Sequence, residues 1–306
     1  MDETKRKPGR AVQMILYGPA PFFAYPWKPL LNTLYGGGYT KSYRHFRKQH
    51  MNGMNLFLHC WCLVWQLSSN YALLAKLDTA CAPLAVALNL PDQKQGGRLV
   101  TRATSLLWCL HLLSASPTPL LVKMASVCSI FLAHNYLGPL FSTHWRNVVF
   151  WQGFMEAAAV QKLILNRPTL LDMRSAVYFL ARTALWRYFS RKEGCLKHKS
   201  ATLSSIVAAI TITIASSKKP LSSVALGFYG WMVALLTGNK TLYLWSAGMM
   251  ATLSQGVSHR IADEAGTLEV LQDDAFDQTS YELSHVTYFP NLLFQACHAH
   301  LRLQFK

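Results

Sequence analysis

Residues 50–59 read HMNGMNLFLH and place two histidines and an asparagine at the start of the first long apolar run of the chain. If this stretch is helical, Asn55 and His59 are four residues apart and share one face, while His50 precedes His59 by about two and a half turns. Imidazoles at a membrane boundary are costly to bury unless they are paired, hydrogen-bonded or bound to a metal. The stretch therefore indicates either a metal site or an interfacial helix whose imidazoles lie among lipid headgroups.

The rest of the composition is that of a membrane protein. Of 306 residues, 51% are hydrophobic and only 14% are charged, and the charges are segregated from long apolar runs. These runs lie at 55–75, 103–116, 125–141, 201–217, 221–238 and 241–257. We expect an all-α fold, a polytopic membrane helix bundle with about six spanning helices and additional interfacial helices. Residues 1–53 then form a membrane-surface lead-in, and residues 54–306 form the transmembrane helical domain.

The formal net charge of +16 is explained by topology. The lysines and arginines lie in the connections between apolar runs, densely before residue 54 and again at 174–199, so they indicate contacts with anionic headgroups and no nucleic-acid partner. Seven cysteines, an odd number without a CxxC pair, are expected to be small buried residues in reducing or lipid surroundings.

Several connections contain helix-breaking residues. Residues 11–40 are rich in proline, glycine and aromatic side chains and are expected to lie on the membrane surface, and 76–102 is expected to be a loop. A helical hairpin with short arms is expected around Pro117 and Pro119. The segment 174–199 is amphipathic and favours a surface helix.

A second informative stretch, QGVSHRIADE at 255–264, follows the last apolar run. Gln255 and His259 are four residues apart, as are His259 and Asp263, so on a helix they share one face. Seven of the fourteen acidic residues fall between residues 263 and 282. This concentration indicates either a solvated charged loop or a supply of carboxylates for a cation.

The two stretches together resemble the membrane dioxygenase family typified by the fungal enzyme that α-oxidises 2-hydroxy fatty acids in the endoplasmic reticulum. One motif is a histidine followed by an asparagine five residues on and a histidine nine residues on, here His50, Asn55 and His59. The other is a glutamine and a histidine that close a later helix, with an acid four residues on, here Gln255, His259 and Asp263. Ser258 stands where the family has glycine.

The resemblance implies a non-haem iron(II) enzyme that uses dioxygen to shorten a 2-hydroxy acyl chain by one carbon. His50, His59 and His259 are the expected metal ligands, and Asp263 or Glu264 completes the shell. Imidazole with carboxylate suits Fe(2+) and leaves positions open for dioxygen and substrate. Asn55 is expected to orient a ligand or the substrate. A secondary set of candidates comprises His45 and His285.

The implied partners are membrane lipids and a lipid-like substrate that enters from the bilayer, and the implied location is the membrane of the endoplasmic reticulum. Two other hypotheses remain open from the residues. One is a non-enzymatic membrane protein, such as a lipid carrier or a complex subunit. The other is a membrane cyclase or isomerase that uses the acids for proton transfer without a metal.

A shared site also constrains topology, because His59 and His259 must then lie on the same side of the membrane. An even number of crossings must separate them, whereas seven segments are candidates once the polar segment 150–165 is added. Its glutamate, lysine and two glutamines make this segment the one expected not to cross. Imidazoles more than about 10 Å apart could not share one ion with bonds of roughly 2 Å.

Overall fold

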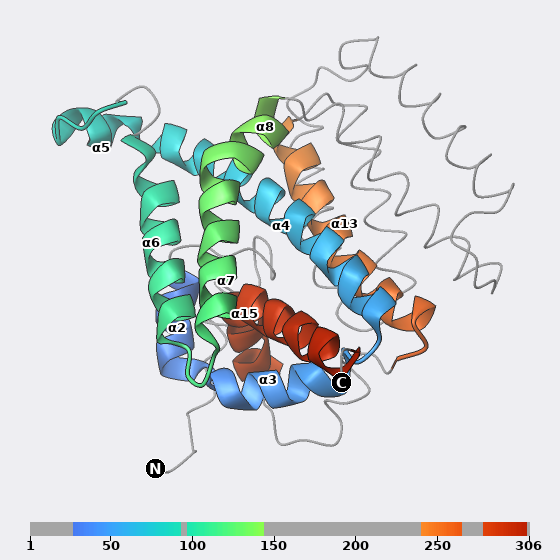
Figure 1. Cartoon of the computed structure of the whole chain (residues 1–306). Helices are drawn as coiled ribbons and strands as arrows, with labels where there is room; N and C mark the ends of the chain where they lie inside the picture. The colour runs from blue at the N-terminus through green and yellow to red at the C-terminus, as the bar shows by residue number, and fades with distance from the viewer. Residues whose placement is uncertain (1–26, 93–96, 144–239, 265–277, 305–306) are drawn as a thin grey trace, which may run out of the picture.

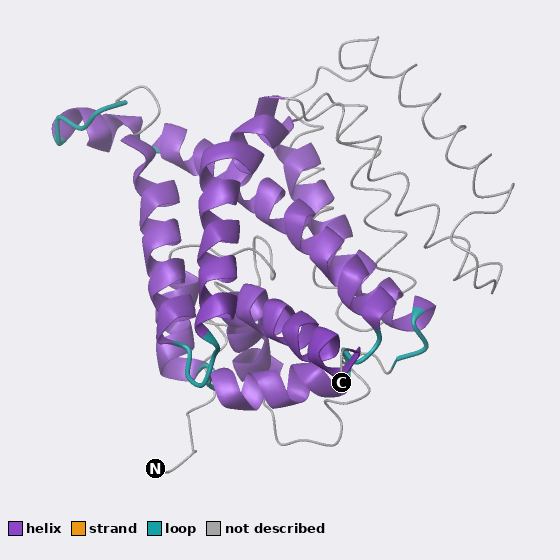
Figure 2. Cartoon of the chain, viewed as in Figure 1, coloured by secondary structure: helices purple, strands orange, loops and turns teal. Residues whose placement is uncertain are grey.

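The computed structural model describes residues 27–92, 97–143, 240–264 and 278–304, and every regular element in these ranges is helical (Figure 2). The all-α class expected from the sequence therefore holds for this part of the chain. The apolar runs at 201–217 and 221–238, the polar segment 150–165 and the amphipathic segment 174–199 lie outside the described residues.

The central helix is α4, Gly53–Ala80, along which α13, Lys240–Ile261, packs over much of its length (Figure 1). Helix α4 begins within one residue of the predicted start, because the side chain of Asn52 caps it by accepting a hydrogen bond from Met54 N at 2.8 Å. The α13 side chains buried in this interface include Tyr243 and Leu244. The pairing brings together two stretches that are almost 200 residues apart in sequence.

Helices α6, Leu99–Ser114, and α7, Leu120–Leu132, lie side by side and form the predicted hairpin (Figure 1). The second arm is longer than expected, because α7 runs on through the π-helical turn η2, Ala133–Leu137, into α8, Gly138–Thr143. Helix α8 packs on α4, where Gly138 approaches Tyr71. The second arm of the hairpin therefore packs against the central helix α4.

Helix α15, Gln278–Gln304, closes the other side of the described bundle and contacts α2, Trp27–Tyr35, and α3, Tyr39–Lys48. Asn291 donates from Nδ2 to the carbonyl oxygen of Leu112 at 2.8 Å, which also ties α15 to α6. Tyr39 donates its hydroxyl to Gln295 and ties α3 to α15. These two contacts hold the start of α3 and the end of α6 against α15.

The expectation that residues 76–102 form a loop was wrong. Residues 76–102 include the last turn of α4 and a short helix, α5, Ala82–Ala87. Residues 11–40 include α2. In both cases a proline, Pro83 or Pro29, stands in the first turn of the helix, where the missing N–H is not needed and the fixed φ is already helical.

Among the described residues, one helix is both long enough and apolar enough to cross a membrane, and it runs over Leu120–Thr143. The apolar helix Leu99–Ser114 beside it is shorter than this.

Candidate metal centre

The three histidines expected to share an ion converge in the structure. The ring centroids of His50 and His59 are 4.4 Å apart, those of His50 and His259 are 4.6 Å apart, and those of His59 and His259 are 5.0 Å apart. One ligand-capable nitrogen from each ring lies within 4.8 Å of the other two, and all three residues are buried. This His triad can hold a metal ion.

Each member of the His triad comes from a different part of the backbone. His50 lies in the short link between α3 and α4, His59 lies in the second turn of α4, and His259 lies in the last turn of α13. Packing of α13 along α4 and of α3 on α15 brings the three together. The site is therefore built at one end of the bundle by tertiary contacts.

Hydrogen bonds to the backbone decide which ring nitrogens carry protons. His50 Nδ1 lies 2.7 Å from the carbonyl oxygen of Phe46, and His59 Nδ1 lies 2.9 Å from that of Asn55. A carbonyl oxygen only accepts, so each Nδ1 donates and each Nε2 keeps its lone pair. The two Nε2 atoms are 3.0 Å apart. Two lone pairs facing each other at this distance repel, and a cation between them removes the repulsion.

The environment keeps His50 neutral. Burial holds the pKa of His50 well below its usual value of 6.5, and the neighbouring His59 and His259 lower it further. The ring of Phe46 stacks on the His50 ring with centroids 3.6 Å apart. A neutral imidazole is the form that binds a metal ion, so the site is prepared for ligation at physiological pH.

Asn55 connects the parts of the site. Its Nδ2 donates to the carbonyl oxygen of Gln49 at 3.1 Å and to Glu264 Oε2 at 2.5 Å. Its Oδ1 accepts a hydrogen bond from Ser258 Oγ at 2.7 Å. The same Nδ2 lies 3.2 Å from His259 Nδ1. The amide therefore ties α13 to the start of α4 beside the histidines.

The structure distinguishes the two acids that the sequence left as alternatives. Glu264 Oε1 accepts hydrogen bonds from the backbone N–H groups of Met51, at 2.5 Å, and Asn52, at 2.7 Å. Asp263 is exposed and has a left-handed backbone with a φ of 52°. Helix α13 ends at Ile261, and the turn at Asp263 carries Glu264 back to the start of α4. Glu264 thus binds Asn55 and the link that follows His50.

The secondary candidates lie beside the His triad and are not part of it. His285 stacks on Phe289 with ring centroids 5.1 Å apart, and burial lowers its pKa to about 3. His45 is buried, and its Nε2 lies 3.0 Å from Gln49 Nε2. Both rings therefore belong to the wall around the site.

Ser258 is a site residue whose contacts the sequence did not reveal. It is fully buried, and its Oγ lies 3.0 Å from His59 Nδ1 as well as 2.7 Å from Asn55 Oδ1. Its hydroxyl accepts from the imidazole while it donates to the amide, so it bridges the two. The sequence feature that could have identified Ser258 as a site residue is its position directly before His259.

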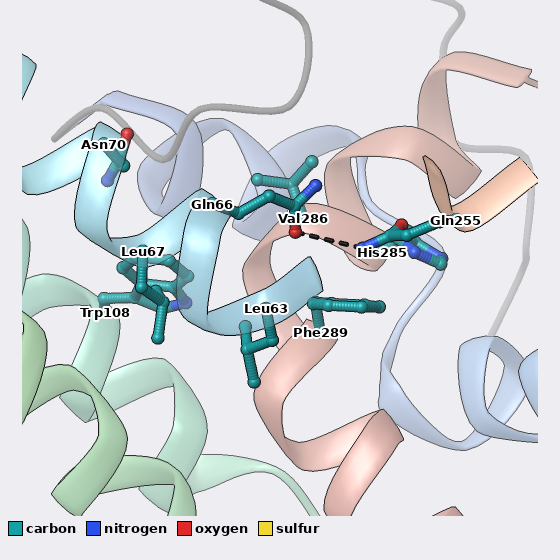
Figure 3. A pocket seen from close by; sticks show the side chains of 9 residues that line it. All are labelled: Leu63, Gln66, Leu67, Asn70, Trp108, Gln255, His285, Val286 and Phe289. Atoms are coloured by element: carbon teal, nitrogen blue, oxygen red, sulfur yellow. Dashed lines mark hydrogen bonds between the residues drawn. The ribbon is translucent and has the colours of Figure 1, made fainter. Parts of the chain in front are cut away.

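A small cavity lies one helical turn from His59 along α4, and its lining includes Leu63, Gln66, Gln255, His285 and Phe289 (Figure 3). Gln255 donates from Nε2 to Gln66 Oε1 at 3.0 Å across it. Its volume of about 20 Å³ suffices for one water molecule and not for an acyl chain.

No protein-family model, no curated protein and no solved structure matches this chain. The chemistry that the chain can perform therefore follows from the His triad and its hydrogen-bonded surroundings.

Proposed function

We propose that the chain is an integral membrane iron(II) dioxygenase that shortens 2-hydroxy long-chain fatty acids by one carbon. The observation that carries the proposal is the buried His triad, in which the backbone holds two Nε2 lone pairs 3.0 Å apart. The match of His50, Asn55, His59 and His259 to the two motifs of the resembled family supports it.

The donor set suits iron. His50, His59 and His259 would hold the ion through imidazole nitrogens, two of which already lie 3.0 Å apart. Imidazole together with carboxylate suits iron(II), and three imidazole ligands would leave positions open for dioxygen and substrate. Glu264, bound to two backbone N–H groups and Asn55, serves beside them as the carboxylate that orders the site.

The proposed reaction breaks the C1–C2 bond of the 2-hydroxy acid. The carboxyl group leaves as carbon dioxide, C2 is oxidised to the new carboxyl group, and dioxygen is reduced, giving one water and an acid one carbon shorter. Bound iron supplies the binding and reduction of dioxygen. The chain supplies the ligands and their orientation, and the rings of Phe46 and Phe289 keep bulk water away.

Arg47 supports an acidic substrate. Its guanidinium donates to the carbonyl oxygen of His50 and so lies at the edge of the site, and its side chain is only half-buried. A guanidinium in this place can pair with the carboxylate of the incoming acid. Because the adjacent cavity has room for only one water molecule, we place the acyl tail in the surrounding bilayer.

The membrane assignment is supported by an inverted distribution of polarity. On α4, α6 and α7 the exposed positions are mostly apolar except near the helix ends, where Lys76 and Arg102 are exposed, while polar side chains are buried between the helices. The exposed apolar residues include Phe57, Val64, Leu77, Leu106, Leu110, Leu113, Leu121, Met124 and Phe131, and the buried polar residues include Ser68, Ser69, Asn70, Thr101, Thr104 and Ser126. We infer six crossings in all, with the segment 150–165 not crossing, and a location in the endoplasmic reticulum.

The proposal is tested by turnover. Full-length protein purified in detergent and loaded with iron(II) under argon is mixed with 2-hydroxypalmitate and dioxygen, and products are identified by mass spectrometry. We expect an acid one carbon shorter, formed only with iron. If iron-loaded protein forms no such product, the dioxygenase proposal fails and a lipid carrier or complex subunit becomes the better account. Turnover without metal that is lost in Glu264→Ala would instead indicate a cyclase or isomerase.

A further inference from the structure

Two cysteines that the proposed function does not use lie next to each other. Cys60 Sγ and Cys297 Sγ are 3.8 Å apart, although the residues are 237 positions apart in sequence. Cys60 belongs to α4 and Cys297 belongs to α15, and these two helices pack on each other. Neither residue lies in a closed core, because both side chains are half-buried.

The distance is that of a thiol pair in contact. A disulfide has a sulfur–sulfur bond of about 2.05 Å, so the two atoms must approach by roughly 1.8 Å for the bond to form. The other described cysteines, by contrast, are without such a neighbouring thiol among the contacts of the structure: Cys62 is buried within α4 and Cys128 is exposed on α7.

The surroundings also make Cys297 the more reactive member. The contact with the Cys60 thiol is the largest influence that lowers the pKa of the Cys297 thiol, and the guanidinium of Arg47 lowers it further. The thiolate is the nucleophile in thiol–disulfide exchange. Cys297 is therefore placed to attack first and Cys60 to resolve.

We propose that Cys60 and Cys297 are a redox modification site, a dithiol that closes reversibly to a disulfide joining α4 to α15. The oxidant is a small-molecule disulfide of the glutathione class. The inference goes beyond the proposed function, because it requires neither iron nor a fatty acid.

The disulfide forms in two steps of thiol–disulfide exchange. Cys297 thiolate attacks one sulfur of the oxidant, a mixed disulfide forms, and one small thiolate leaves. Cys60 then attacks Cys297 Sγ, the second small thiolate leaves, and the proton of Cys60 passes to solvent or to that thiolate. The two protein thiols lose two electrons in total, and the oxidant gains them to become two thiols.

The position of the pair gives the modification a consequence. Cys60 directly follows His59 in α4, and His300, one turn after Cys297, has its Nδ1 3.0 Å from the carbonyl oxygen of Met51 in the link that carries His50. A covalent bond at this point fixes the end of α15 over the start of α4. The disulfide therefore restricts movement of α15 relative to the start of α4, beside the His triad.

The test uses the full-length wild-type protein in detergent without added metal. It is treated with oxidised glutathione until a soluble cysteine-containing reporter peptide in the same sample is fully modified, remaining thiols are alkylated, and peptides are mapped by mass spectrometry. We expect a peptide pair joined through Cys60 and Cys297 that dithiothreitol separates. In Cys60→Ser we expect Cys297 to keep a stable glutathione adduct, while Cys62→Ala, the matched control, keeps the cross-link.

Two results overturn the proposal. One is that both cysteines remain alkylatable in the wild-type protein after the reporter peptide has reacted fully. The other is that both carry separate glutathione adducts and no joined peptide forms. Either result stands whether or not the iron-dependent turnover described above is found, so the two proposals fail independently.

Discussion

Single residues decide the protonation and the geometry of the site. The spacing of His50 and His59 in the sequence predicted that they converge, because both stand beside the start of one helix. The choice between Asp263 and Glu264 could not be predicted, because it depends on the left-handed backbone at Asp263 that reverses the chain after α13. Helical spacing placed Asp263 on the face of His259, but the helix has already ended at Ile261.

The role of Glu264 gives the first prediction at this scale. Glu264→Gln puts an amide where the carboxylate accepts from Asn55 and from two backbone N–H groups, so at least one donor loses its acceptor. Because hydrogen bonds to a charged group each contribute about 1.5–3 kcal/mol, the free energy of unfolding should fall by about that amount. Iron affinity should fall roughly 10- to 100-fold, as for other residues that orient ligands.

The neighbouring acid is the matched control. Asp263→Asn keeps the left-handed backbone, which asparagine tolerates, and should leave both stability and iron affinity close to wild type. Thermal unfolding in detergent and iron titration measure the two quantities. Equal losses in both variants would show that position 264 has no special role.

His285 gives a prediction about pH. Burial lowers its folded-state pKa to about 3, whereas the unfolded chain titrates near 6.5. Between these values the unfolded chain binds a proton that the folded chain does not, so stability falls as the pH drops below about 6.5, by up to about 1.4 kcal/mol per pH unit. Above this window the contribution is constant.

The measurement is the apparent unfolding temperature of the metal-free protein between pH 4.5 and 7.5. His285→Phe keeps the stacking on Phe289 and should reduce the loss on acidification, whereas His111→Gln, at a half-exposed position, should not. An unchanged pH dependence in His285→Phe would contradict the assignment of acid sensitivity to this buried ring.

At the scale of helices, the apolar runs predicted where several elements lie. The prolines were a poor guide, because helices form at positions where they had suggested a break. The hairpin of α6 and α7 and the start of α4 follow from long apolar stretches and their turns. Helix α15 was not expected as an element, because its 27 residues include the internal Pro290 and many polar side chains. Its helical state depends on packing against α2, α3, α4 and α6, which local sequence does not encode.

The contact of α8 with α4 gives a prediction at this scale. A Cβ atom at Gly138 would lie 2.6 Å from the Cβ atom of Tyr71, a distance that forces the two helices apart. Gly138→Ala should therefore destabilise the protein by about 1–3 kcal/mol, the usual cost of overpacking. Thr143→Ala, on an exposed residue of the same helix, is the control for thermal unfolding. Unfolding temperatures that agree for the two variants would show that the interface can relax.

At the scale of the molecule, the described helices have polar side chains buried among them and many apolar side chains on their outer surface. If a bilayer covers that surface, the protein remains in the pellet when membranes are washed with alkaline carbonate, and only detergent extracts it. A charged substitution on the outer face, Leu110→Arg, should lower membrane insertion, and the similar change at exposed Leu303 near the end of α15 should not. Recovery of the wild-type protein in the carbonate supernatant would rule out spanning helices.

The central claim is that His50, His59 and His259 bind one iron ion, and the metal content of purified protein tests it most directly. Protein loaded with iron(II) under argon and desalted is measured by plasma mass spectrometry beside the three single alanine variants, with His134→Ala, outside the His triad, as control. We predict about one iron per chain in the wild type and in the control, and a large loss in each variant of the His triad. Full iron content in all three variants, or none in the wild type, would contradict the claim.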